Sequence, residues 1–340
     1  MKKVVTFGEI MLRLSPPDYQ RIVQANNLDV TYGGGEANVA ASLANFGADS
    51  YFVTKLPENL LGQAAINHLR RFGVSTEYVL KGGERLGIYF AEKGASQRPS
   101  VVVYDRAYSS VSSIKNGEID WEKVFYQKDW FHFTGITPAL GDGPAEVTKE
   151  AVKAAKKLGL TVSCDLNYRK KLWSQKKAKN VMSQLMEYVD VLVGNEEDAE
   201  KVFGIKAETA DIVGGKLDDD GYKRVAVKLA KKFNFDKVAI TLRESYSASD
   251  NGWSALLYDG KDFYKSKEYK IHIVDRVGGG DSFCGALVYA LLENKSPQVA
   301  VEFAVAASCL KQTIPGDFNH VDVTEVEILA GGDGSGRVQR

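Results

Sequence analysis

The sequence predicts an α/β protein built on one doubly wound, mainly parallel sheet with helices on both faces. Short apolar segments typical of strands alternate with amphipathic segments typical of helices from residue 4 to about residue 329. No internal repeat or interdomain linker interrupts this alternation. With 340 residues and 44% hydrophobic content, the chain has enough apolar material for one large domain with a sizeable core.

The elements can be assigned in order from apolar periodicity. The chain opens with a strand at 4–14, a glycine-rich turn and helix at 32–47, a strand at 50–56 and a helix at 61–74. Residues 86–93 and 100–106 alternate with period two around a polar turn, which predicts a hairpin. A strand follows from 130, then a helix at 144–159, a strand at 160–165, a strand and a helix within 190–204, and a helix at 221–234. The chain continues with a strand from 235, a long polar loop, two strands up to 264, and helices from 281 and 296.

Charge and composition exclude several classes of protein. Lys+Arg and Asp+Glu both number 44, so no global charge favours nucleic acid or a membrane surface. The best apolar run, FCGALVYALL, is much shorter than the ~18 residues that a membrane span needs. Glu9 and Arg13 interrupt the first apolar segment, so no signal peptide is predicted, and three dispersed cysteines indicate free thiols. We therefore expect a cytoplasmic protein, and the histidine spacing predicts no structural zinc.

The segment 274–292, VDRVGGGDSFCGALVYALL, ends a strand in three glycines and an aspartate before an apolar helix. Gly278, Gly279 and Gly280 allow a sharp turn that presents backbone N–H groups to an anion at the positive end of the helix. Asp281 would stand beside that anion, where an ionised carboxylate can accept a proton. A purely structural turn with Asp281 as N-cap is the alternative.

The sequence DRVGGGDSFCGAL resembles the second signature of the PfkB carbohydrate kinases, D-T-x-G-A-G-D-x-F. The matching residues are Asp275, Gly278, Gly280, Asp281 and Phe283. Arg276 replaces the usual Thr on the side of the nucleotide and monovalent cation, and Gly279 replaces the usual Ala. The resemblance implies that Asp281 is the catalytic base and that Gly278, Gly279 and Gly280 form the anion hole.

A second glycine-rich segment, GGGEANVA, precedes the first helix. It is not a dinucleotide fingerprint, because Asn38 stands where G-x-G-x-x-G needs its last glycine, and no phosphate-binding G-x-x-x-x-G-K-[ST] occurs. It resembles the first PfkB signature, which implies that Gly34, Gly35 and Asn38 contact sugar hydroxyls. In the family, strands at about 10–32 and 86–108 form a lid over the sugar.

Three further candidates for sugar binding lie on the predicted hairpin. Tyr89 and Tyr104 are ordinary strand residues, whereas Arg106, on the same face as Tyr104, favours a site role. The sequence DLNYR resembles 2-keto-3-deoxygluconate kinases, in which the arginine, here Arg169, faces a sugar-acid carboxylate. Asn167 in the same segment is assigned to the nucleotide side.

The segment DVLVGNEEDAEKVFG resembles the N-x-x-E element that positions magnesium and phosphate through water. The spacing gives Asn195 and Asp198, with Glu197 or Glu196 as alternatives because Asp replaces the usual Glu. An acidic helix start of purely structural origin is also possible. Thr241, Arg243 and Ser245 are assigned to ATP, as is Asp317 in TIPGDFN, a segment similar to ketodeoxygluconate kinases.

The resemblance implies one kinase domain over residues 1–330, and the glycine-rich composition of residues 331–340, without apolar periodicity, predicts a flexible tail. The expected reaction is ATP-dependent phosphorylation of the terminal hydroxyl of 2-keto-3-deoxygluconate to 2-keto-3-deoxy-6-phosphogluconate, with Mg²⁺. A requirement for K⁺ or another monovalent cation stays open. Alternatives are a fructokinase or another sugar kinase of the family, and, from another class, a non-catalytic sugar-binding regulator. The expected partners are a sugar acid, ATP and a second copy bound through the lid strands.

Overall fold

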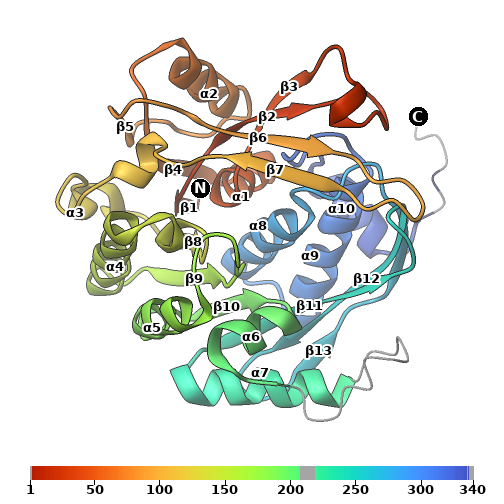
Figure 1. Ribbon diagram of the computed structural model, residues 1–340. Coiled ribbons are helices and arrows are strands. Elements are labelled where there is room, and N and C mark those ends of the chain that lie inside the picture. The colour runs from red at the N-terminus through yellow and green to blue at the C-terminus, as the bar shows by residue number, and fades with distance from the viewer. Residues whose placement is uncertain (1, 207–218, 335, 337–340) are drawn as a thin grey trace.

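The computed structural model describes residues 2–206, 219–334 and 336. A large sheet with helices on both faces forms the body of the molecule, and a smaller sheet lies apart from it (Figure 1). The predicted fold class is confirmed. The predicted flexible tail at 331–340 falls partly on residues 335 and 337–340, which lie outside the described residues.

The main sheet contains ten strands: β1 (Lys3–Phe7), β4 (Asp49–Leu56), β5 (Val79–Lys81), β8 (Trp130–Thr134), β9 (Thr161–Asp165), β10 (Val191–Gly194), β11 (Lys237–Ser245), β12 (Asp250–Tyr258), β13 (Phe263–Lys265) and β14 (Tyr269–His272). The strand order is β13-β12-β11-β10-β9-β8-β1-β4-β5, with β14 paired to β12. The strands from β11 to β5 are parallel, whereas β12 pairs antiparallel with β11, β13 and β14.

The prediction of a long polar loop between the strand from residue 235 and the next strand is wrong. Strands β11 and β12 continue through this polar segment as an antiparallel ladder that reaches Ser245 opposite Asn251. Only the short turn between them leaves the sheet. Cross-strand backbone hydrogen bonds satisfy the polar main chain there, so the strands do not need an apolar sequence to continue.

Ten α-helices and three short 3-10 helices connect the strands in the described part of the chain. They are α1 (Gly35–Asn45), α2 (Leu60–Arg71), α3 (Trp121–Phe125), α4 (Asp142–Lys157), α5 (Gln175–Met186), α6 (Glu196–Phe203), α7 (Asp219–Phe233), α8 (Gly279–Leu292), α9 (Pro297–Gln312), α10 (Val323–Ala330), η1 (Ile22–Gln24), η2 (Ser110–Ser113) and η3 (Thr137–Leu140). None of the helices in the described ranges is long and apolar enough to cross a membrane.

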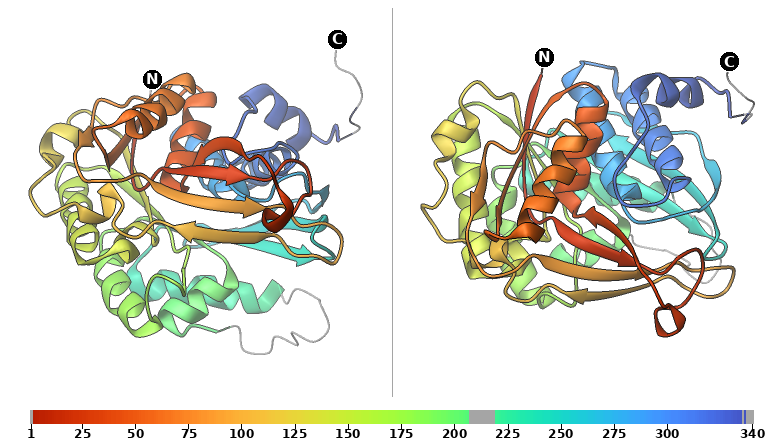
Figure 2. Two further views of the ribbon diagram at one scale, coloured as in Figure 1. Left: turned by 45° about the horizontal axis from the view of Figure 1, so that its top comes forward. Right: turned by 90° about the horizontal axis from the view of Figure 1, so that it is seen from above.

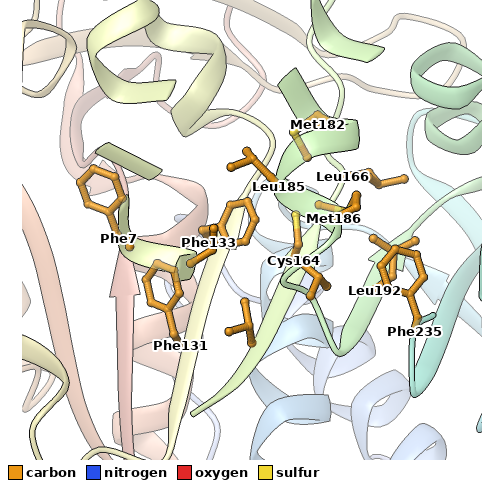
Figure 3. Close-up of a cluster of buried hydrophobic side chains, with 14 of the residues drawn as sticks. Phe7, Phe131, Phe133, Cys164, Leu166, Met182, Leu185, Met186, Leu192 and Phe235 are labelled. Carbon is orange, nitrogen blue, oxygen red and sulfur yellow. The ribbon is translucent and has the colours of Figure 1, made fainter. Parts of the chain in front are cut away.

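One face of the main sheet is covered by α4, α5, α6 and α7. These amphipathic helices bury one apolar stripe each, as Val147, Ala151 and Ala155 do in α4. Aromatic residues of the strands, including Phe7, Phe131 and Phe133, belong to the same buried cluster as Met182 and Leu185 of α5 in this layer of the core (Figure 3).

The other face carries α1, α8 and α9, with α10 packed on α9. Helices α8 and α9 are apolar on nearly all sides, which is typical of helices buried within a domain. The sheet and the neighbouring helices thus fix α8 in position, and with it the glycine turn that precedes it.

The second sheet has the order β3-β2-β6-β7, formed by β2 (Met11–Ser15), β3 (Asp29–Gly33), β6 (Gly87–Glu92) and β7 (Val101–Asp105). The predicted hairpin of β6 and β7 is confirmed. This sheet forms a layer of its own beside the body of the molecule (Figure 2). Since β2 follows β1 after three residues, the second sheet is anchored at the carboxyl ends of the parallel strands.

Candidate active site

Two cavities meet at the start of α8. The inner cavity has a volume of about 80 Å³, and residues of β2, β6 and β7 form one of its walls. Every residue that the sequence assigned to sugar binding lines it, namely Gly34, Gly35, Asn38, Tyr89, Tyr104, Arg106, Arg169 and Asp281. The fold therefore brings together residues from four separate segments of the sequence.

The second cavity, which we call the glycine cavity, has a volume of about 360 Å³. Its lining includes Asp165, Asn195, Asp198, Thr241, Arg243, Arg276, Gly278, Gly279 and Gly280. The two cavities share the lining residues Val102, Tyr104, Asn167, Arg169, Val277 and Asp281. Asp281 thus faces both spaces.

Asp281 is the third residue of α8 and not its N-cap, because the helix begins at Gly279 with Gly278 as the cap residue. The Asn38 amide donates a 2.6 Å hydrogen bond to Asp281 Oδ2. Burial raises the pKa of Asp281 to about 6, although the Asn38 bond lowers it and Asp317 raises it further. The carboxylate is therefore ionised at neutral pH and is a stronger base than an ordinary aspartate.

The glycine turn requires a residue without a Cβ at position 278. This residue has φ +84°, and a Cβ there would lie 2.0 Å from the carbonyl oxygen of Asp317. A Cβ at Gly279 would meet Gln312, which fills the space of the alanine usual in the signature. Gly280 is exposed and open, and its N–H belongs to the first turn of α8, where backbone donors lack intrahelical acceptors.

Two further carboxylates, Asp165 and Asp198, face the glycine cavity. Burial, helped by Asp198 and Asp281, raises the pKa of Asp165 to about 8. Burial also raises the pKa of Asp198, although amide groups of Tyr168 and Asn195 donate to it. A bound divalent cation would relieve this accumulation of negative charge. Carboxylate oxygens are suitable donors for Mg²⁺.

The three metal candidates do not lie together. Asn195 and Asp198 line the glycine cavity and form a reciprocal capping box at the start of α6. Glu197 instead lines a separate, outer cavity and pairs with Lys201. Successive helical positions point about 100° apart, which accounts for the two adjacent acids facing different cavities here. Nothing is described for the side chain of Glu196.

The two arginines predicted to bind the sugar acid differ in whether a carboxylate pairs with them. Arg106 is buried and forms an ion pair with Glu9, whose other oxygen accepts a 2.6 Å hydrogen bond from Ser109. Arg169 is exposed, and no carboxylate of the described residues lies within ion-pair distance of it. Among the described side chains, Arg169 is therefore free of an ion-pair partner, although its charge acts to lower the pKa of Asp165, Asp198 and Asp281.

Two residues assigned to ATP lie outside the glycine cavity. Ser245 is exposed at the end of β11, whereas Thr241 and Arg243 on the same strand line the cavity. Asp317 lines the inner cavity instead, where Tyr89 donates to one of its oxygens and Arg13 binds the other at 2.6 Å. The chain after α9 turns back towards the second sheet, which removes Asp317 from the expected nucleotide side.

The sequence analysis missed several buried charges around the site. Arg13 on β2 contacts Asp275 and Asp317, each at 2.6 Å, and all three side chains are buried. Glu36 accepts hydrogen bonds from Thr134 and Thr137 beneath the first glycine turn. A charge inside an apolar strand, such as Arg13, is the sequence signal that could have indicated a buried partner.

An outer cavity of about 970 Å³ adjoins the inner cavity and shares Val102, Tyr104, Arg106 and Arg169 with it. Lys170, Lys171 and Lys201 also line it. The path from solvent to the inner cavity is therefore basic, which attracts an anionic ligand.

Comparisons with a family model and with known proteins point to the same family. Residues 1–321 match the model of the pfkB family carbohydrate kinases. The crystal structure of 2-dehydro-3-deoxygluconokinase from Thermotoga maritima is 56% identical, with a TM-score of 0.94, and the match covers 98% of this chain and 100% of that one.

Two other proteins extend the comparison. A 2-dehydro-3-deoxygalactonokinase from Haloferax volcanii is 35% identical over 332 residues, which are 97% of this chain and 98% of the relative. A fructokinase from Xylella fastidiosa with bound ATP has a TM-score of 0.77 at 20% identity and covers 97% of this chain and 98% of that one. At that identity it supports the fold alone.

The contrast between Gly278 and Gly280 gives a test of the turn. We expect Gly278→Ala to lower the free energy of unfolding by about 1–3 kcal/mol, because alanine is strained at φ +84° and clashes with Asp317. Gly280→Ala should leave the unfolding midpoint nearly unchanged but weaken ATP binding, since its methyl group enters open space in the glycine cavity. Denaturant unfolding and calorimetric titration with ATP measure the two effects. Equal destabilisation by both substitutions would contradict this description of the turn.

Proposed function

Because the chain belongs to the pfkB family of carbohydrate kinases, we propose that it transfers the γ-phosphoryl group of ATP to the terminal hydroxyl of 2-keto-3-deoxygluconate. The Thermotoga maritima structure, 56% identical over nearly the whole chain, carries the name of this activity. The product is 2-keto-3-deoxy-6-phosphogluconate, and ADP is released.

The observation that carries this proposal is the position of Asp281 between the two cavities. A sugar in the inner cavity and the phosphates of ATP in the glycine cavity would approach each other only at this carboxylate. Asn38 holds Oδ2, which leaves Oδ1, on the side of Gly35, for the sugar hydroxyl. This is the arrangement required of a general base.

In the proposed reaction, Asp281 accepts the proton of the terminal hydroxyl as the oxygen attacks the γ-phosphorus. A bond forms between the sugar oxygen and phosphorus, and the bond from phosphorus to the bridging oxygen of ADP breaks. The free N–H groups at the start of α8 face the transferring phosphoryl group and stabilise its negative charge. Asp281 later releases the proton to solvent.

Magnesium would accompany ATP in the glycine cavity. Asp198, Asn195 and Asp165 would supply oxygen ligands there. Among the described side chains, no group of three or more His, Cys, Asp or Glu residues is arranged to hold a metal ion. We infer that these residues hold Mg²⁺ partly through water. The ion would supply charge neutralisation on the phosphates.

A sugar acid suits the basic entrance to the inner cavity. Arg169 offers a guanidinium group with no ion-pair partner among the described residues, and Lys170 and Lys171 of the outer cavity extend the positive field. The Arg106–Glu9 pair has no net charge, so Arg106 would act there as a hydrogen-bond donor. A neutral ketose such as fructose, our alternative substrate, makes no use of the charge on Arg169.

A second candidate substrate is the galactonate analogue, which differs from the gluconate compound in the configuration of one hydroxyl. The relative from Haloferax volcanii is named for it. The machinery around Asp281 would be the same for both sugars.

We propose that the second sheet acts as the lid, because Tyr89 and Tyr104 reach the inner cavity from β6 and β7. Its strands also expose Val30, Val101 and Val103, which supports contact with a second copy of the chain. Lid closure would exclude water, which competes as a phosphoryl acceptor.

Replacement of the proposed base gives the first test. Asp281→Asn should lower kcat about 10²- to 10⁴-fold with little change in ATP affinity, because the amide cannot accept the proton. Coupled ADP release measures kcat. Asp142→Asn is the matched control, since Asp142 also lies in a first helical turn but is exposed outside the cavities. An Asp281→Asn rate near that of the wild type would remove Asp281 from the role of base.

Substrate class is tested by the same assay with 2-keto-3-deoxygluconate, its galactonate analogue, fructose and ribose. We expect turnover of the keto-acids alone. Arg169→Ala should raise KM for the keto-acid about tenfold or more, because a charge-assisted hydrogen bond is lost, with a smaller change in kcat.

Arg70→Ala, an exposed arginine that binds Thr76 outside the three cavities, is the control and should behave as the wild type. Turnover of fructose but not of the keto-acids would contradict the proposed substrate and leave the kinase assignment standing.

A further inference from the structure

A fully buried lysine lies directly behind the glycine turn. Lys311, one residue before the end of α9, is the one lysine in the described part of the chain whose side chain is fully buried. Its ammonium donates to the backbone carbonyl oxygens of Gly316, at 2.6 Å, of Asp275, at 3.3 Å, and of Val277. Lys311 is not among the residues to which a catalytic role was assigned above.

The three acceptors match the protonated form of the side chain. An ammonium group has three N–H donors, whereas a neutral amine would present a lone pair to one of the carbonyl oxygens. Burial lowers the pKa of Lys311, but the carboxylates of Asp275, Asp317 and Asp281 oppose that effect. A cluster of backbone carbonyl oxygens is also the environment that proteins use to replace the hydration shell of K⁺.

This carbonyl cluster belongs to the site. Asp275 and Val277 precede the glycine turn, and Gly316 lies in the loop after α9. The Lys311 side chain reaches so close to the turn that a Cβ on Gly278 would lie 3.2 Å from its Cε. The Gly316 N–H also donates to Asp275 Oδ2 at 3.1 Å. The ammonium thus joins the two loops that shape the start of α8.

We propose that the Lys311 ammonium takes the place of a monovalent cation behind the glycine turn, so that phosphoryl transfer by this chain needs no K⁺. This rests on the proposed kinase function. The carbonyl oxygens that could hold such an ion at the back of the anion hole are already occupied by the lysine. Lys311 touches neither cavity, so it is a positioning residue that fixes the turn and supplies a constant positive charge.

The wild-type protein gives the first test. Initial rates with the keto-acid and Mg-ATP are compared in KCl, NH₄Cl, NaCl and choline chloride at a matched ionic strength of about 0.1 M, which holds screening constant. We expect kcat to agree within about twofold in all four salts, a range within ordinary salt effects on exposed charges. A kcat that rises several-fold in KCl over choline chloride would overturn the proposal.

Two variants separate the cation role from simple packing. Lys311→Ala empties the carbonyl cluster, and kcat in choline chloride should fall about 10- to 100-fold, as when a residue that orients an active site is removed. KCl or NH₄Cl should restore part of this rate. Lys311→Met keeps the volume of the stem within the cluster, so its kcat should fall but show no response to K⁺. Absence of cation rescue in Lys311→Ala would reduce Lys311 to a structural contact.

A matched control and a second readout complete the test. Lys267, an exposed lysine that donates to the Ala330 carbonyl far from the turn, can be changed to Ala and should leave kcat unchanged. The melting temperature of Lys311→Ala should rise in KCl relative to choline chloride, whereas that of the wild type should not, because only an empty cluster binds the ion. If no sugar is phosphorylated, the proposed function fails while this thermal comparison still decides the role of Lys311.

Discussion

Two buried cations hold the loop in front of α8, and the active-site geometry depends on them. Arg13 joins the carboxylates of Asp275 and Asp317, and Lys311 joins the backbone carbonyl groups of the same two loops. A buried charge is costly unless it is fully paired, so these contacts can be made in very few arrangements of the backbone. Since Arg13 comes from β2, the second sheet is fastened to the glycine turn by the same interaction.

Much of the site could be predicted from the sequence because of the topology. In a parallel sheet the carboxyl ends of the strands lie at one edge, so segments that follow β1, β8, β9 and β10 are brought together whatever their separation along the chain. DLNYR follows β9 in this way, whereas the two glycine-rich segments follow β3 of the second sheet and β14, which pairs antiparallel with β12. These segments were identified by their resemblance to family motifs, and the fold brings the sugar-side candidates from Gly34 to Asp281 together in one cavity.

The parts that the sequence did not predict depend on three-dimensional partners. Arg13 is 262 residues from Asp275 and 304 from Asp317, and no local pattern links them. Glu197 and Asp198 are adjacent acids, yet because of the rotation between successive helical positions Glu197 lines the outer cavity and Asp198 lines the glycine cavity. Asp317 lies in the inner cavity in contact with Arg13 and Tyr89, and no local pattern indicates these partners. Burial decides each of these cases, and burial is a property of the folded chain.

The central claim is that Asp281 is the base between sugar and ATP, and its titration tests that claim most directly. The measurement is the pH dependence of kcat/KM for the keto-acid, which reports ionisation of the enzyme before the sugar binds. Because the raised pKa of Asp281 is about 6, activity should fall about tenfold for each pH unit below that value. The Asp281→Asn variant should not show this fall in activity below pH 6. A profile with no inflection near pH 6, or the same inflection in the variant, would contradict the account.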